Sequence, residues 1–216
     1  MTLFELEKKY CRTLKKQYSQ LKKLYSNAID DCSFSLQKRD ITKAIIFRMK
    51  TYYETHNDIR KLLNKKNIAP VPDFLVEAVA FYLKLFLEKR GKKLEVHSER
   101  KLKRAIGSMK PDISIWKGDE VTAIIECKTN LGFNREGWEE DFRKRERRLK
   151  KLFPKAEAFL LVLSAINWPG FDVNDERVGK QFFCLCSEGL RRIKKQPIES
   201  VIKNPVEKLF SQILKY

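Results

Sequence analysis

The sequence predicts an α/β fold, in which a central mixed β-sheet is flanked by helices and preceded by a helical N-terminal extension. Three observations support this prediction. Residues 1–69 show only helical periodicity, a long apolar helix follows them, and several apolar runs of strand length come later in the chain. Hydrophobic residues make up 43% of the 216 residues, which is enough to bury a substantial core.

The first 69 residues predict two basic helices. In the first, apolar residues recur at spacings of three and four: Leu3, Leu6, Tyr10, Leu14, Tyr18, Leu21 and Tyr25. Asp40 can cap the second helix, and Pro70 and Pro72 end the region. We therefore expect residues 1–69 to form a separate two-helix extension before a domain at 70–216. The extension can contact DNA, hold a dimer together, or act only as a structural brace.

The rest of the chain alternates between strand and helix patterns. The first helix of this region is apolar on nearly every side, which predicts that its neighbours cover it all round. The expected elements, in order, are a helix at 73–91, strands at 93–98, 112–116 and 121–128, a helix at 134–153, strands at 157–163 and 181–186, and a last helix opened by Asn204 and Pro205. Residues 117–120 predict a hairpin turn between two of the strands.

The composition narrows the function. A net charge of +18 and a pI near 9.7 favour a polyanionic partner such as nucleic acid. Five cysteines without CxxC spacing and only two histidines argue against zinc and are typical of reduced thiols. The first residues lack a secretory signal, and no apolar run is long enough to span a bilayer. We therefore expect a soluble cytoplasmic protein.

Several familiar catalytic motifs are absent. The sequence contains no GxxxxGK[ST] loop, no GxGxxG, no GxSxG and no HExxH, and its two histidines lie far apart. These absences argue against nucleotide hydrolysis and acyl transfer.

Three charged residues are instead expected to converge at one edge of the sheet. Strand alternation places Glu126 and Lys128 on the same face at the end of an apolar strand. Asp112 opens the neighbouring strand, so a hairpin would bring it beside Glu126. Clustered carboxylates repel one another unless a cation lies between them, and carboxylates without soft ligands select Mg²⁺ or Mn²⁺. The alternative is an ordinary ion pair between Glu126 and Lys128.

Glu77 is a fourth candidate. It is the only charged residue between Phe74 and Leu83, in a helix that we expect to be buried. Buried carboxylates are rare unless they are paired or bind a cation. The alternative is a glutamate at the helix edge that pairs with a lysine or arginine.

The segment KPDISIWKGDEVTAIIECKTN resembles the core of the PD-(D/E)xK, or restriction-endonuclease-like, nuclease superfamily. The order of helix and strand elements over residues 73–163 is also similar to that core. The helix after Lys128 lacks the glutamine motif of the RecB-like exonuclease branch. A chain with helical additions and no helicase module resembles a type II restriction endonuclease or a related small nuclease.

This resemblance implies roles for the candidate residues. Asp112 and Glu126 would bind Mg²⁺ with the backbone carbonyl of Cys127, and Mn²⁺ is expected to substitute. Lys128 would orient the attacking water, and Glu77 would bind a second metal ion or a metal-bound water. The implied reaction is hydrolysis of double-stranded DNA to 5′-phosphate and 3′-hydroxyl ends, by a homodimer or together with a partner subunit.

DNA contacts are expected just before the candidate site. The basic residues of this stretch are Arg100, Lys101, Lys103, Arg104 and Lys110. The lysines and arginines of the helix at 134–153, such as Arg135 and Arg143, are a second candidate for DNA contacts. For this helix we favour instead a solvated face with pairs such as Glu139–Arg143 and Glu140–Lys144. In the loop after the strand at 157–163, Trp168 and Phe171 can touch DNA or cover the sheet edge. Two other functions fit the sequence: a repair or recombination nuclease acting on branched or nicked DNA, and a DNA-binding protein without catalysis.

Overall fold

The computed structural model describes residues 1–34, 37–68, 71–104, 107–131, 135–164, 175–189 and 197–216. The chain divides into two compact units, Met1–Phe34 and Ser35–Tyr216. None of the described helices is both long enough and apolar enough to cross a bilayer.

The first unit is a single helix, α1 (Leu3–Asp31). A capping box begins it: the Glu5 amide donates to Thr2 Oγ1 at 3.2 Å, and the Thr2 amide donates to Glu5 Oε2 at 2.6 Å. The helix contains every residue of the predicted apolar stripe.

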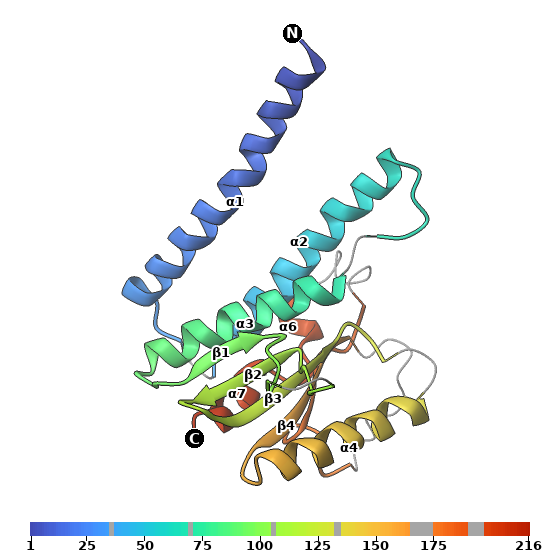
Figure 1. The fold of residues 1–216 in the computed structure, drawn as a ribbon. Coiled ribbons are helices and arrows are strands. Elements are labelled where there is room, and N and C mark those ends of the chain that lie inside the picture. Colours follow the sequence, from blue (N-terminus) through green and yellow to red (C-terminus); the bar gives the residue numbers. More distant parts are fainter. Residues whose placement is uncertain (35–36, 69–70, 105–106, 132–134, 165–174, 190–196) are drawn as a thin grey trace. The chain divides into compact units, whose positions relative to one another are not determined.

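The second unit contains a five-stranded sheet in the order β1-β2-β3-β4-β5 (Figure 1). Its strands are β1 (Glu95–Ser98), β2 (Ile113–Lys117), β3 (Glu120–Lys128), β4 (Glu157–Ser164) and β5 (Phe182–Cys186). Strands β1, β2 and β3 pair antiparallel, whereas β3, β4 and β5 pair parallel. The prediction of a mixed sheet flanked by helices, with a helical N-terminal region, is therefore confirmed.

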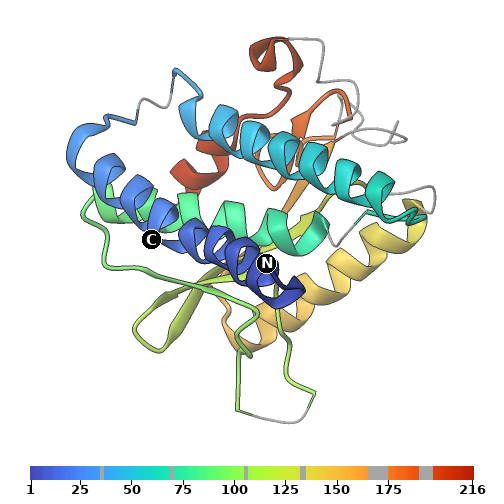
Figure 2. The same cartoon turned by 90° about the horizontal axis from the view of Figure 1, so that it is seen from above.

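Helices cover both faces of this sheet. The helices are α2 (Asp40–Leu62), α3 (Val71–Lys89), α4 (Arg135–Leu152), α6 (Ile198–Val201) and α7 (Val206–Ile213). Helix α4 packs over the face that carries Ile124 and Leu160, and α2 and α3 lie on the other face (Figures 1 and 2). The central strands are buried on both sides, which explains their uninterrupted apolar sequences.

Helix α2 lies in the second unit, although we expected residues 1–69 to form one extension. It packs on α3 and buries apolar residues that include Ile45, Ile46 and Met49. These side chains complete the core on the α3 side of the sheet. The boundary between compact units therefore follows Phe34, and only α1 is separate from the sheet domain.

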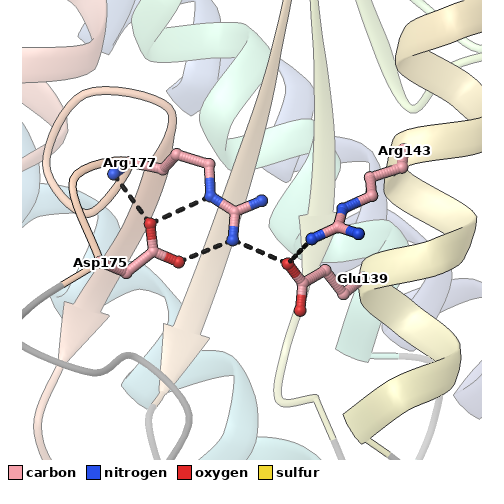
Figure 3. Close-up of polar contacts among 4 residues, drawn as sticks. All are labelled: Glu139, Arg143, Asp175 and Arg177. Carbon is pink, nitrogen blue, oxygen red and sulfur yellow. Dashed lines mark hydrogen bonds and ion pairs between the residues drawn. The ribbon is translucent and has the colours of Figure 1, made fainter.

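A polar network ties α4 to the segment before β5 (Figure 3). Arg177 donates hydrogen bonds to both carboxylate oxygens of Asp175, at 3.0 and 2.7 Å, and to Glu139 of α4 at 2.7 Å. Arg143 donates to the same Glu139 oxygen at 2.8 Å, which confirms the predicted pair between these two residues. The Arg177 guanidinium lies 4.5 Å from the centre of the Phe182 ring. The network therefore fixes the entry to β5 against α4.

The first turns of α2 and α7 cap each other in the core. The Thr42 amide donates to Glu207 Oε1 at 3.0 Å, and its hydroxyl donates to Glu207 Oε2. The same hydroxyl accepts from the Val206 amide at 2.8 Å. The predicted cap Asn204 has another role, because its side chain accepts from the Cys184 amide of β5. Asp40 likewise is the first helical residue of α2, and Arg39 occupies the N-cap position.

Thr42→Val is expected to lower the free energy of unfolding by about 2 kcal/mol, because the buried Val206 amide loses its acceptor and Glu207 Oε2 loses its donor. Valine keeps the shape of threonine, so little packing is lost. Urea unfolding measures the effect. Thr51→Val in the same helix is the control, because that hydroxyl is exposed and bonds only to the Phe47 carbonyl. Equal losses in the two variants would contradict the role of the buried cap.

Candidate active site

A cleft of about 770 Å³ opens between α3, β1 and the ends of β2 and β3. Its charged lining residues are Asp73, Glu77, Lys84, Glu99, Asp112 and Lys128. Helix α3 contributes Asp73, Glu77 and Lys84, which recur at spacings of four and seven on its exposed side. One wall of the cleft is therefore the polar, solvent-facing stripe of α3, and the other wall is the edge of the sheet.

Asp112 lies at the start of β2, beside the end of β3. Its Oδ2 accepts a hydrogen bond of 2.8 Å from the amide of Cys127. The antiparallel register that pairs Ile113 with Ile125 accounts for this position. The predicted hairpin thus brings Asp112 next to the ExK segment.

Glu126 points to the other side of the sheet. Only 3% of it is exposed, and it does not line the 770 Å³ cleft. Its Oε1 accepts a hydrogen bond of 2.8 Å from Arg145 Nη1 of α4, next to a cavity of about 110 Å³ that Trp138 and Asp141 also line. Lys128 borders both spaces. The structure therefore places Asp112, Lys128 and Glu77 on one cleft, with Glu126 directly behind it.

Burial raises the pKa of Glu126 to about 7, and the negative charge of Asp112 adds to the increase. The positive charges of Arg145 and Lys128 oppose this effect. Two carboxylates are therefore close enough for their charges to interact, and only one of them is largely removed from water.

Cys127 separates the two charged residues of the ExK segment. Its thiol is buried, and burial raises its pKa far above the ordinary range. A thiol in this state is a poor nucleophile. The contribution predicted for this residue is its backbone carbonyl, and that stays a prediction.

Glu77 lines the cleft, but its surroundings differ from the prediction. We expected its side chain to be buried, whereas Glu77 is exposed. The apolar residues of α3 pack against α2 and the sheet, which leaves a narrow polar stripe facing the cleft. The position of Glu77 is therefore explained by solvent access to the cleft, without any need for a buried partner.

The donor atoms suit a hard divalent cation. Mg²⁺ commonly uses one or two carboxylates and keeps several waters, and Asp112 and Glu126 can supply those carboxylates. Among the described residues, no three His, Cys, Asp or Glu side chains already lie together as a metal site. Glu126 would also have to share or release Arg145. The oxygen donors of these residues therefore suit Mg²⁺, but Glu126 must move before it can bind the ion together with Asp112.

The five predicted DNA-contacting residues differ in their surroundings. Arg100 stacks over Trp116 at 4.0 Å and contacts His97 at 2.8 Å. Lys110 pairs with Glu99 at 3.2 Å. The other three, Lys101, Lys103 and Arg104, are exposed. Trp168 and Phe171 lie outside the described residues.

Arg145 is the residue of this site that the sequence did not indicate. It belongs to a helix rich in arginine and lysine, and nothing local distinguishes it from its neighbours. The pair Glu140–Lys144 beside it was expected and forms at 2.8 Å. The bond from Arg145 to Glu126 depends on how α4 crosses the sheet.

No protein-family model matches the sequence, and no curated protein sequence matches it. Among solved structures, this chain is similar to a chain from a low-resolution structure of the native A2B2 tetramer of BbvCI, a restriction endonuclease. The similarity covers 97% of this chain and 88% of that one, with a TM-score of 0.40 and 12% sequence identity. A likeness of this size supports no conclusion about the function of this chain.

Proposed function

We propose that this chain is a magnesium-dependent DNA endonuclease. The observation that carries the proposal is the meeting of Asp112 with the Glu126–Lys128 segment, through the hydrogen bond from the Cys127 amide. A strongly basic composition agrees with a polyanionic substrate. Resemblance to type II restriction endonucleases suggests duplex DNA, and a homodimer or a partner subunit for cutting both strands.

In this proposal Asp112 and Glu126 would hold Mg²⁺ together with the Cys127 carbonyl. The bound ion would withdraw charge from the phosphate and lower the pKa of a water molecule. Glu77 faces the same cleft and can orient that water or contribute to a second cation. These residues therefore supply the oxygen donors of the reaction.

Lys128 supplies a positive charge at the mouth of the cleft. Its ammonium can hold the attacking water and offset the charge that builds on the phosphate oxygens. The water oxygen forms a bond to phosphorus, and the bond from phosphorus to the 3′ oxygen breaks. The 3′ oxygen takes up a proton, which leaves 5′-phosphate and 3′-hydroxyl ends.

The proposal is tested by incubating the full chain with supercoiled plasmid and phage DNA in Mg²⁺, Mn²⁺ or EDTA. We expect cleavage with either ion and none in EDTA, and sequencing of the product ends should find 5′-phosphates. Absence of cleavage on every substrate and with both ions would refute the proposal. Preference for synthetic junctions or nicked DNA over intact duplex would instead identify a repair or recombination nuclease.

One observation favours a second candidate, a DNA-binding protein without catalysis. Arg145 already pairs with Glu126 in the structure, and a permanent pair would leave Asp112 and Glu77 as the remaining candidate carboxylates of the predicted site. Salt-dependent DNA binding without metal-dependent turnover would support this alternative.

A further inference from the structure

Most of the charged residues that line the candidate cleft are acids. Asp73, Glu77, Glu99 and Asp112 contribute four carboxylates, against the ammonium groups of Lys84 and Lys128. A polyanion gains little from such a lining. If DNA is the substrate, the attraction that holds its phosphates must come from a surface beside the cleft.

Between β1 and β2, the described residues 99–104 and 107–111, here called the loop, are anchored in the core. Leu102 and Met109 are 4% and 5% exposed, and they pack in the cluster beneath α4. The Leu102 amide donates to the Met109 carbonyl at 3.0 Å, and the Lys103 amide donates to Ser108 Oγ at 2.9 Å. This anchoring holds the charges of Lys101, Lys103 and Arg104 outward on a fixed base.

The same loop lies against the C-terminal half of α4. Arg148 Nη2 donates to the Gly107 carbonyl at 3.0 Å, which leaves its positive charge uncancelled. Lys151 lies one turn beyond both Arg147 and Arg148, so it shares a side of the helix with each of them. Arg147, Arg148 and Lys151 are all exposed. Loop and helix therefore present one basic area, here called the loop–helix surface: Lys101, Lys103, Arg104, Arg147, Arg148 and Lys151.

Few negative charges offset this surface. Within the described part of the chain, none of its six cations has a carboxylate within ion-pair distance. The acids near it have other main partners: Glu139 pairs with Arg143 and Arg177 (Figure 3), Glu157 pairs with Lys150, and Glu146 accepts a hydrogen bond from Gln181. Glu140 pairs with Lys144, and the charge of Arg147 has a smaller effect on it. The large apolar residues that the described second unit exposes, Phe47, Leu62 and Leu63, belong to α2 and its end. A positive surface without exposed apolar side chains suits a polyanion better than a protein partner.

We infer that the loop–helix surface binds the backbone phosphates of duplex DNA and so holds the substrate beside the acidic cleft. Its loop begins at Glu99 and ends next to Asp112, which both line that cleft, so the loop connects the surface to the cleft. This inference rests on the proposed nuclease function. It adds three residues of α4 to the expected DNA contacts, and it omits Arg100 and Lys110, which already have acidic partners.

The test is DNA affinity in EDTA, where cleavage cannot occur, by fluorescence anisotropy of a labelled duplex at several salt concentrations. The variant neutralises Lys103, Arg104, Arg147 and Lys151 to glutamine and keeps Arg148 bonded to the loop. We expect the Kd to rise at least about tenfold at about 0.1 M salt, and the slope of log K against log salt to fall by about 2 to 4. The control neutralises Lys65, Lys66, Lys92 and Lys93, exposed residues at the ends of α2 and α3, and removes the same charge.

Equal weakening in variant and control would show that only net charge matters and would overturn the inference, as would an unchanged Kd. If the four-site variant fails to fold, Lys103→Gln and Lys151→Gln are measured singly, each with an expected slope change of about 1. The proposed function fails differently: the wild-type chain would not cleave DNA with any cation, whatever the variants bind.

Discussion

Asparagine in place of Asp112 is expected to reduce magnesium-dependent DNA cleavage at least about 100-fold while leaving the fold intact. The asparagine Oδ1 can still accept the hydrogen bond from the Cys127 amide, so the junction between β2 and β3 is preserved. What the substitution removes is the negative charge that would hold the cation. The variant therefore separates the chemical role of Asp112 from its structural one.

The measurement is the nicking rate of supercoiled plasmid, together with the urea midpoint in EDTA. Asp119→Asn is the matched control, because Asp119 is an exposed carboxylate in the turn between the same two strands. We expect the control to cleave like the wild type. A cleavage rate for Asp112→Asn within a few-fold of wild type would exclude Asp112 as a cation ligand. A lowered urea midpoint would instead assign it a structural role.

The sequence was sufficient to predict the sheet, because the signals for its strands are local. The run before Glu126 and the run at 157–163 are apolar without interruption, as strands buried on both faces must be. The turn that joins β2 and β3 contains Gly118 in the left-handed region, at φ 60°, which glycine adopts at low cost. From these features alone, the convergence of Asp112 with the end of β3 could be expected.

The side chains around the candidate site were less predictable, because they depend on contacts between distant elements. Strand alternation correctly separates Glu126 from Cys127, but it does not indicate which face carries the cleft. The partner of Glu126 is Arg145, nineteen residues away on a helix with many similar cations. The exposure of Glu77 follows from how α3 is packed, which its own apolar sequence does not reveal. These are tertiary facts, and periodicity within one element contains no information about them.

Glu126 is expected to make the metal-free protein less stable as the pH rises from about 4.5 to about 7. Its pKa is raised from 4.5 to about 7 in the folded state, first by burial and then by Asp112. The folded chain therefore keeps this proton at pH values where the unfolded chain has lost it. Stability from the neutral carboxyl group is complete below the unfolded pKa and is lost as the pH passes the folded pKa. A pKa shift of this size corresponds to a loss of about 3 kcal/mol in the free energy of unfolding once the pH is above 7.

Comparison with Glu126→Gln isolates this effect, because glutamine can still accept from Arg145 but cannot ionise. In EDTA, the free energy of unfolding of the wild type minus that of the variant is expected to fall by about 3 kcal/mol between pH 4.5 and pH 8. If the difference stays constant over this range, burial does not raise the pKa of Glu126. Added Mn²⁺ at pH 8 should recover part of the loss in the wild type and little in the variant. A cation beside the ionised carboxylate offsets its desolvation, which links the instability of the metal-free chain to the proposed site.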